Sequence, residues 1–399
     1  MTAARSSSVE GPGPRVRRWA SAIELRLRAL LVAPEPAEPA TNRDGWRRAI
    51  APAALVCAAA MALSAVLLAL PIGFGFSLDG QRIIDQRLPM TWSHLLVPFH
   101  SHLNLLPIAI WDRMAVVFGT ASSTPYLALL LATHVALSTF STAALSSRIG
   151  PIYALAFGLP LALLGSAFFD LVAPWQILFT ITLLAGLGSV VASIELRRTI
   201  ARRLAVAGCL VIAVLTSNVA EFIILALLLW YLIDDRRGQI IELAPAVLAF
   251  GAWFVVYGRT GLTTDTSPFS LRAILAIVPY TAAAIASGVG GMIGLGPLAG
   301  AFAFGALVAR FRPPRPMLAF LIAIVAMFAV GALFRSFSGP DQPLTSRYIY
   351  LVAYMTAFGI IAAGYRPAIR PSVALGLSLV AVAGNLVILA RELPAYLVH

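Results

Sequence analysis

Long apolar runs separated by short polar segments dominate this chain. A run of roughly 18 or more apolar residues is long enough to cross a bilayer as an α-helix. The alternation of apolar and polar positions that is typical of a membrane β-barrel is absent. The runs predict nine membrane-spanning helices, at roughly 50–74, 126–147, 151–169, 174–195, 240–257, 292–310, 316–334, 346–364 and 372–390.

One further apolar run, residues 204–233, is too long for a single crossing. It is interrupted by the polar triplet Thr216-Ser217-Asn218. We therefore expect two short helices that form a hairpin.

Residues 272–290 are also apolar, but they contain residues that weaken or kink helices. We expect an interfacial or re-entrant helix here that does not cross the membrane. Together with the hairpin, this gives 11 crossings, with ten or twelve as alternatives. The predicted fold class is all-α, a polytopic transmembrane helical bundle. The residues that argue against a crossing are Pro279, Gly288, Gly290 and Gly291.

Composition agrees with this prediction. Of the residues, 60% are hydrophobic and 12% are charged, and the mean hydropathy is +0.88. These values lie outside the range of soluble domains, so the lipid bilayer is the expected environment. Cys57 and Cys209 both lie within apolar runs, which indicates small core residues and no disulfide framework.

The two ends of the chain differ from its middle. Residues 1–49 are rich in Arg, Pro, Ser and Glu, which predicts a disordered basic tail with one short helix around 16–31. The first apolar run is too long for the core of a cleavable signal. We expect one transmembrane domain over residues 50–390 and a short tail at 391–399.

The placement of arginine predicts the topology. All 29 basic residues are Arg, and the net charge is +12. If the N-terminus is cytoplasmic, 21 arginines fall on the cytoplasmic side and 8 on the outer side, as the positive-inside rule requires. The charge therefore reflects topology and not nucleic-acid binding. We predict a multi-pass protein of the cytoplasmic membrane.

In this topology residues 75–125 form the longest outer loop, and long loops are usually functional. Scarce polar residues gather within it at 96–114, LVPFHSHLNLLPIAIWDRM. We expect an ordered loop whose helix, 107–118, lies in the plane of the membrane. Ile108, Trp111, Ala115 and Phe118 would form its apolar face, and Asp112 and Arg113 the opposite face.

Two carboxylates of this loop are candidates for catalysis. Asp79 and Asp85 lie just beyond the first span, where a carboxylate can act as a general base toward a hydroxyl above the membrane. The alternative is structural. Asp79 could cap a short helix, and Asp85 lies three residues from Arg82.

The loop also contains His94, His100 and His102, followed by Asn104. An H-x-H pair can bind a metal when a third ligand is present, or it can donate hydrogen bonds to a substrate. At an interface, histidine also commonly bonds to backbone or lipid headgroups. No third ligand is evident, so we expect no metal and no other cofactor, and we take His100, His102 and Asn104 as candidate substrate contacts.

Two later outer loops supply further polar groups. Asp170 precedes Trp175 and Gln176; the Trp is typical of an interfacial aromatic belt, and the Gln is a candidate substrate contact. Arg347 and Tyr348 begin a later span. Arg347 could bind a lipid-linked phosphate with Tyr348 beside it, or extend toward headgroups.

Glu221 follows the break in the 204–233 run. Asn218 and Glu221 have the spacing of a capping box, with Asn218 as the N-cap of the second hairpin helix. This predicts a structural role for the buried carboxylate.

Several classes of activity lack their sequence signals. The chain has no Walker A sequence, no G-x-G-x-x-G after a strand and no G-x-S-x-G elbow. No paired charges lie in mid-span, as in ion-coupled pumps.

The order of these features resembles the GT-C superfamily of membrane glycosyltransferases, particularly related actinobacterial membrane proteins. PFHSHLNLLPIAIWDRM lies in the first outer loop, and FFDLVAPWQILF (168–179) and TSRYIYL (345–351) occupy later positions of that pattern. The acidic pairs frequent in the superfamily are missing, because Gly80 follows Asp79.

The resemblance implies an inverting sugar transfer from a polyprenyl-phosphate-linked donor at the outer membrane face. The base would be Asp79 or, second, Asp85, and Arg347 would contact the donor phosphate. Asp79, Arg347 and one of the two loop histidines, His100 or His102, would then share a cavity.

Two other classes remain open. A transporter or flippase of lipid-linked or small hydrophobic cargo would show matched helix breaks in two halves, and 216–218 and 287–296 match only loosely. A non-catalytic envelope-assembly protein would not need the clustered His, Asn and Asp. The pattern sets no oligomeric state.

Overall fold

The structure is a computed structural model of the whole chain. It describes residues 42–70, 81, 83–85, 91–98, 102–197, 199–258, 271–310, 313–335, 346–366 and 368–396. The predicted N-terminal tail helix, Asp79 and His100 lie outside these residues.

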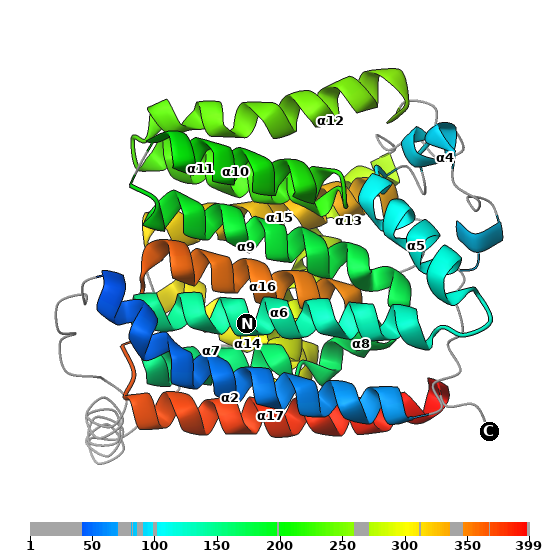
Figure 1. The fold of residues 1–399 in the computed structure, drawn as a ribbon. Helices are drawn as coiled ribbons and strands as arrows, with labels where there is room; N and C mark the ends of the chain where they lie inside the picture. The colour runs from blue at the N-terminus through cyan, green and yellow to red at the C-terminus, as the bar shows by residue number, and fades with distance from the viewer. Residues whose placement is uncertain are drawn as a thin grey trace, which may run out of the picture.

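In the described part, the protein is a bundle of helices that lie side by side (Figure 1). Two short elements of the first loop, α4 and α5, cover one end of this bundle, which we call the first-loop end. The α-helices are α2 (Asn42–Ala69), α4 (Trp92–Leu96), α5 (Leu105–Phe118), α6 (Thr124–Ile149), α7 (Pro151–Ala162), α8 (Phe168–Val172), α9 (Ile177–Glu195), α10 (Thr199–Val214), α11 (Val219–Ile233), α12 (Ala244–Val256), α13 (Leu271–Met292), α14 (Gly296–Arg310), α15 (Arg315–Arg335), α16 (Ser346–Ala363) and α17 (Pro371–Glu392). The 3-10 helices are η1 (Gly165–Ala167), η2 (Pro174–Gln176), η3 (Arg237–Leu243) and η7 (Leu393–Tyr396).

The all-α, multi-pass prediction is confirmed. Among the described residues, nine helical segments are long and apolar enough to cross a membrane, and two shorter apolar helices accompany them. Helix starts follow local chemistry, because proline occupies the first turn of α6, α7 and α17, where its missing N–H costs nothing. Gly150, with φ +92°, ends α6 and allows the turn into α7.

The predicted hairpin within 204–233 is confirmed. Helices α10 and α11 are separated by a break from Leu215 to Asn218, and they contact each other. The tip of the hairpin is tied to the first loop, since the Leu106 N–H donates to the Leu215 carbonyl at 2.9 Å. Glu221 does not complete a capping box: the Asn218 side chain makes no capping hydrogen bond, and the Ser217 hydroxyl accepts from the Val219 N–H instead.

Helix α13, which covers the predicted non-crossing segment 272–290, packs against α16 over its last turns. A Cβ on Gly288 would lie 2.6 Å from the Val352 side chain, and a Cβ on Gly291 would lie 2.5 Å from the Ile349 side chain. Length and composition qualify Ala273–Met292 as a membrane span, whereas the predicted span at 292–310 holds a shorter apolar helix. This finding counts against the predicted non-crossing helix, and the number of crossings stays a prediction.

Helix α16 is the centre of the bundle. Every residue from Tyr348 to Met355 is buried, and α16 contacts α6, α9, α13 and α15. Peripheral helices instead present bulky apolar side chains to the surroundings: Leu248 and Val256 on α12 are 70% and 62% exposed. Such a surface is compatible with lipid but not with water. Arg347, in the first turn of α16, therefore lies directly before the most enclosed segment of the bundle.

The first-loop helix differs in detail from the prediction. Helix α5 begins at Leu105, two residues before Pro107, and it buries Ile108 and Trp111 as expected. Phe118, predicted on the same apolar face as Ile108 and Trp111, is 55% exposed, whereas those two residues are buried. Asp112, predicted on the solvent face, is buried, and it accepts a hydrogen bond from the Arg113 Nε at 3.0 Å. The helix is wedged into the protein by its first two turns only, so its polar and apolar faces are not those of a helix lying flat.

Candidate functional site

A break in one membrane helix creates the candidate site. Helix α7 ends at Ala162, and the chain continues through η1 into the one-turn helix α8. Gly165 sits where a Cβ would lie 2.0 Å from the Asn385 carbonyl oxygen of α17, so no other residue fits without movement of the backbone. The break thus lets the chain approach α17 closely and turn toward the core.

Asn385 fixes this break from the opposite side. Its Oδ1 accepts from the Ser166 N–H at 2.9 Å, and its Nδ2 donates to the carbonyls of Gly291 and Ala381 at 3.1 and 3.0 Å. The Ser166 hydroxyl donates to the same Gly291 carbonyl at 2.9 Å. The Ser166 N–H that follows the break is thereby satisfied, as a buried backbone group requires. We call Ser166, Gly291 and Asn385 the asparagine knot.

The knot positions Asp170 inside the protein. The Asp170 side chain is fully buried, and within the described part of the chain neither of its carboxylate oxygens has a hydrogen-bond partner. The cation that acts on it is Arg347, at the start of α16. The Arg347 guanidinium carbon lies 5.8 Å from the centre of the Phe169 ring, and its Nε is buried without a partner among the described residues. Asp170 and Arg347 therefore each have an unpaired polar atom within the described residues, and Arg347 packs against Phe169, the residue next to Asp170 in the chain.

Tyr350 and His134 close the inner side of this pair. The His134 Nδ1 lies 2.8 Å from the Tyr350 hydroxyl, and its Nε2 lies 3.1 Å from the Ala162 carbonyl. Because a carbonyl only accepts, a neutral His134 carries its proton on Nε2 and accepts the Tyr350 proton on Nδ1. The Tyr350 hydroxyl then has no proton left for Asp170, although the carboxylate is close enough to act on it electrostatically.

The first loop reaches the same segment of chain from outside. Trp111 of α5 packs edge-on against Trp175 of η2, with ring centres 5.6 Å apart, and against Tyr126 of α6 at 4.9 Å. Ile83 and Leu95 join this apolar cluster. Trp175 is therefore a buried contact between the first loop and residues 168–176, and not the interfacial belt residue that the sequence suggested.

Three of the predicted site residues belong to this region. Arg347 acts electrostatically on Asp170. Gln176 follows Asp170 in the same segment of chain, and its Oε1 is buried without a partner among the described residues. Tyr348 is buried and accepts a hydrogen bond from Tyr280. Because Arg347 acts on Asp170 across the fold while Gln176 follows it in the chain, the shared site stays a prediction.

The described candidates of the first loop differ in their surroundings. Asp85 is exposed, and it accepts a hydrogen bond from the Gln81 Nε2 at 2.8 Å. His102 is half-buried, and Asn104 is buried directly before α5, although its side chain does not cap that helix. Asp79 and His100, which complete this set, lie outside the described residues, so the predicted cavity shared by Asp79 and Arg347 stays a prediction.

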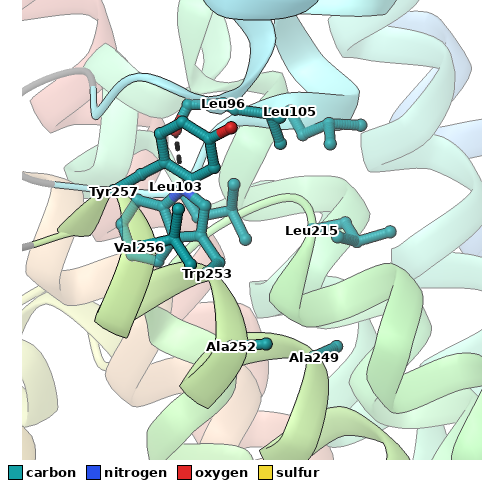
Figure 2. A pocket seen from close by; sticks show the side chains of 9 residues that line it. All are labelled: Leu96, Leu103, Leu105, Leu215, Ala249, Ala252, Trp253, Val256 and Tyr257. Carbon is teal, nitrogen blue, oxygen red and sulfur yellow. Dashed lines mark hydrogen bonds between the residues drawn. The ribbon is translucent and has the colours of Figure 1, made fainter.

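An apolar cavity of about 310 Å³ lies at the first-loop end, between the first loop, the hairpin tip and α12 (Figure 2). The Trp253 Nε1 donates to the Leu96 carbonyl at 2.7 Å and ties α12 to the loop at this place. Leu103 and Leu105, on either side of Asn104 in the chain, both line the cavity. The remaining lining residues are Leu96, Leu215, Ala249, Ala252, Trp253, Val256 and Tyr257.

No cluster of three or more His, Cys, Asp or Glu side chains that could hold a metal ion occurs within the ranges that the structure describes. The Asp170 carboxylate accepts hydrogen bonds, and the Arg347 guanidinium only donates them. Such a pair is suited to an organic ligand or to each other, and not to a cation.

Asp170 is the residue that sequence reasoning missed. The sequence held a signal, because Asp170 follows two phenylalanines inside an apolar run, and a carboxylate within a membrane segment usually marks function. Its position near the predicted end of a span made it look like an ordinary loop residue. Only the turn of the chain after α7 shows that it points into the core.

Comparison with known proteins finds few matches. No protein-family model and no curated protein matches this chain. One solved structure is similar, that of ArnT from Cupriavidus metallidurans bound to undecaprenyl phosphate, with a TM-score of 0.46 and 16% sequence identity over 78% of this chain. The chain spans 59% of the length of that protein. At this TM-score and identity, the likeness assigns no activity to this chain.

Proposed function

We propose that this protein is a GT-C-like membrane glycosyltransferase that takes a sugar from a polyprenyl-phosphate-linked donor at the first-loop end. This end would be the outer face of the cytoplasmic membrane, with the N-terminus on the cytoplasmic side. One observation carries the proposal: a half-buried Arg347, with its Nε unpaired among the described residues, at the first-loop end of the central helix.

Arg347 has the chemistry to hold a lipid-linked phosphate. A guanidinium presents several N–H donors in a plane and binds phosphate oxygens through charge-assisted hydrogen bonds. Phe169 lies beside the guanidinium, and the apolar cavity provides space for hydrocarbon at the same end of the bundle. The phosphate would lie at the membrane surface while its lipid chain stays in apolar surroundings.

The reaction would be a displacement at the anomeric carbon of the donor sugar. A base takes the proton of the acceptor hydroxyl, the hydroxyl oxygen bonds to that carbon, and the bond from the carbon to the phosphate oxygen breaks. The leaving phosphate gains negative charge, which Arg347 stabilises. We propose Asp79 as the base, with Asp85 as the second candidate, because both belong to the first loop.

The other predicted residues would contact substrate. We assign this role to Gln176 and Tyr348 beside Arg347, and to His100, His102 and Asn104 in the first loop. Gln176 is the best supported of these, because its buried Oε1 has no partner among the described residues and can accept from a hydroxyl.

Native mass spectrometry of the purified protein tests the proposal. Wild-type protein should retain polyprenyl-phosphate lipids, and Arg347→Ala should lose them, with partial retention in Arg347→Lys. Arg237→Ala is the matched control, because Arg237 is 77% exposed at the opposite end of the bundle. A wild-type protein that retains no such lipid, or equal retention in Arg347→Ala, contradicts the proposal.

A flippase would also bind polyprenyl-phosphate lipids, so a second measurement separates the two. In liposomes, Asp79→Asn should abolish sugar transfer and leave lipid binding unchanged. Lipid movement across the bilayer without any transfer in the wild type would favour the flippase.

A further inference from the structure

At the end of the bundle opposite the first loop, two connections between helices lie side by side. Helix α6 ends before Gly150 and α16 ends before Gly364, and both glycines have positive φ, at +92° and +61°. The Tyr153 hydroxyl at the start of α7 donates to the Ile369 carbonyl, just before α17. We call residues 148–153 and 361–366 the paired turns.

Two arginines cross between the paired turns. Arg148 reaches from the end of α6 to the end of α16, where its Nε donates to the Ile361 carbonyl at 3.1 Å. Its Nη2 lies 3.0 Å from the position that a Cβ on Gly364 would occupy. Arg366 reaches in the other direction, and its Nη2 lies 4.0 Å from the corresponding position on Gly150. The two guanidinium groups therefore lie over adjacent turns.

Most N–H donors of these two groups are not used by the described residues. Within that part of the chain, no hydrogen bond involves the Arg148 Nη1 or Nη2, or any side-chain nitrogen of Arg366. Both residues are half-buried, so packing restricts them while part of each side chain stays accessible. Guanidinium donors that are held in place and accessible can bind an anion.

The charge at the paired turns stays positive after the neighbouring groups are counted. Glu195 and Arg236 both act electrostatically on Arg148, and their single charges are of opposite sign. The C-terminus of a helix carries about half a negative charge, so the ends of α6 and α16 offset about one of the two arginines, Arg148 and Arg366. About one positive charge remains, which a singly charged anion would balance.

Apolar side chains are exposed beside these cations. Ile50 of α2 and Ile152 of α7 are 69% and 45% exposed, and Ile152 follows Arg148 by four residues. The start of α2 adjoins the same turn, because a Cβ on Gly45 would lie 3.1 Å from the Ser147 carbonyl oxygen. Helices α2 and α17 both begin at this end of the bundle (Figure 1). A ligand of the paired turns would therefore meet cations and a lipid-compatible surface together.

We propose that Arg148 and Arg366 bind the phosphate of an anionic phospholipid, whose acyl chains lie along the exposed apolar side chains of α2 and α7. A phosphodiester headgroup carries a single negative charge and accepts charge-assisted hydrogen bonds from guanidinium groups. A free phosphate ion would meet the same donors but would gain nothing from the apolar surface. Basic sites between membrane helices are known to hold such headgroups. The site is separate from Arg347, so the inference goes beyond the proposed function.

Thermal unfolding in the presence of lipid tests this site. The full chain in dodecyl maltoside is heated with increasing amounts of dioleoyl phosphatidylglycerol, dioleoyl phosphatidylcholine or inorganic phosphate. A ligand that binds the folded state raises the melting temperature, and the dependence on its concentration gives an apparent Kd. Phosphatidylglycerol should raise the melting temperature, whereas phosphatidylcholine and inorganic phosphate should leave it nearly unchanged.

Two variants locate the site. Arg366→Gln removes one cation and no hydrogen bond to a described residue, so it should fold, and it should raise the apparent Kd for phosphatidylglycerol about tenfold. Arg148→Gln should give a similar loss of affinity. Arg237→Gln is the matched control at the same end, because Arg237 is 77% exposed and Asp235 already offsets its charge. The control should leave the Kd within about twofold of the wild type.

Each contrary result overturns the proposal. No rise with phosphatidylglycerol, or an equal rise with phosphatidylcholine, would show that no anionic headgroup is recognised. A rise with inorganic phosphate as large as that with phosphatidylglycerol would identify a site for a free anion. Equal losses of affinity in Arg366→Gln and Arg237→Gln would indicate diffuse attraction to a positive surface. The comparison of lipids in the wild type tests the proposal even if neither variant at the paired turns folds.

Discussion

The two ends of the bundle treat buried charge in opposite ways. At the opposite end, the Glu242 side chain is fully buried, and it accepts a hydrogen bond from the Arg202 Nε at 2.9 Å and a second from the Tyr231 hydroxyl at 3.4 Å. At the first-loop end, Asp170 is equally buried and has no hydrogen-bond partner among the described residues.

The same contrast extends to the neighbouring groups. Near Glu242, Tyr231 also bonds to the Ser193 hydroxyl at 2.6 Å, and the Trp230 Nε1 donates to Asp234 at 2.8 Å. Near Asp170, Gln176 and Arg347 each have a buried polar atom without a partner in the described part of the chain, and the Gln239 Oε1 is one such atom at the opposite end. A satisfied network holds a structure together, whereas unsatisfied buried groups are available to a ligand. We therefore assign the Glu242 network to the architecture and the group around Asp170 to function.

The largest expected effect is on the satisfied end. Glu242→Ala should lower the free energy of unfolding by about 3 kcal/mol, because Arg202 and Tyr231 lose their partner inside the protein. Thermal unfolding in detergent measures this loss, and Glu242→Gln should recover part of it. An unchanged melting temperature in Glu242→Ala would show that this network does not stabilise the protein, and it would contradict the proposed difference between the two ends.

A smaller loss is expected at the asparagine knot. Asn385→Ala should cost about 1–3 kcal/mol, because the Ser166 N–H and the Gly291 carbonyl lose a buried partner. Lipid-phosphate binding should weaken with it, because the knot holds the segment that carries Asp170. The two readouts are the melting temperature and lipid retention. A lower melting temperature with full retention of the lipid phosphate would show that the asparagine knot stabilises the protein without supporting the site.

Asp170→Asn should change stability by less than about 1 kcal/mol, and in the stabilising direction. The substitution replaces a buried carboxyl group that has no hydrogen bond to lose among the described residues with a neutral amide of the same shape, which removes any cost of holding a charge there. Thermal unfolding of Asp170→Asn beside Glu242→Gln compares the two ends directly. A large loss of stability in Asp170→Asn would show that the carboxylate has a structural role and that the ends are alike.

The smallest effect belongs to an ion pair on the surface. The Arg237 Nε lies 3.3 Å from the Asp235 Oδ1 at the opposite end, but the two side chains are 77% and 87% exposed. Arg237→Ala should shift the free energy of unfolding by about 0–1 kcal/mol, since water and salt screen such pairs. A loss as large as that of Glu242→Ala would mean that burial does not decide which pairs matter.

Much of the architecture was predictable because the bilayer restricts what a chain can do. A membrane-spanning backbone must satisfy its own hydrogen bonds, so an apolar run such as 346–364 has to become a helix, and α16 occupies Ser346–Ala363. The polar triplet Thr216-Ser217-Asn218 is unfavourable inside a membrane helix, so it predicted a break in the run 204–233, and the hairpin is confirmed. Arg347, Gln176 and Tyr348 were selected as candidates by the polarity of their loops, and their role in a site stays a prediction.

The tertiary structure alone decided how these groups are used. Asp112 and Trp175 were predicted to face the surface, and both are buried, because α5 and η2 pack on one another. Periodicity within one helix cannot reveal such a contact, since it depends on a second element.

Asp170 shows the physical reason most clearly. Composition and hydropathy record that the chain holds a carboxylate near the end of an apolar run, and this is a local property. Its burial depends on Gly165 and Asn385, and the Ser166–Asn385 hydrogen bond joins positions 219 residues apart. Arg347, the cation that acts on it, belongs to another helix. The sequence alone determined which segments enter the membrane, because that follows from transfer of each helix out of water. The tertiary structure decided which buried charge has a partner, because pairing is a property of two helices at once.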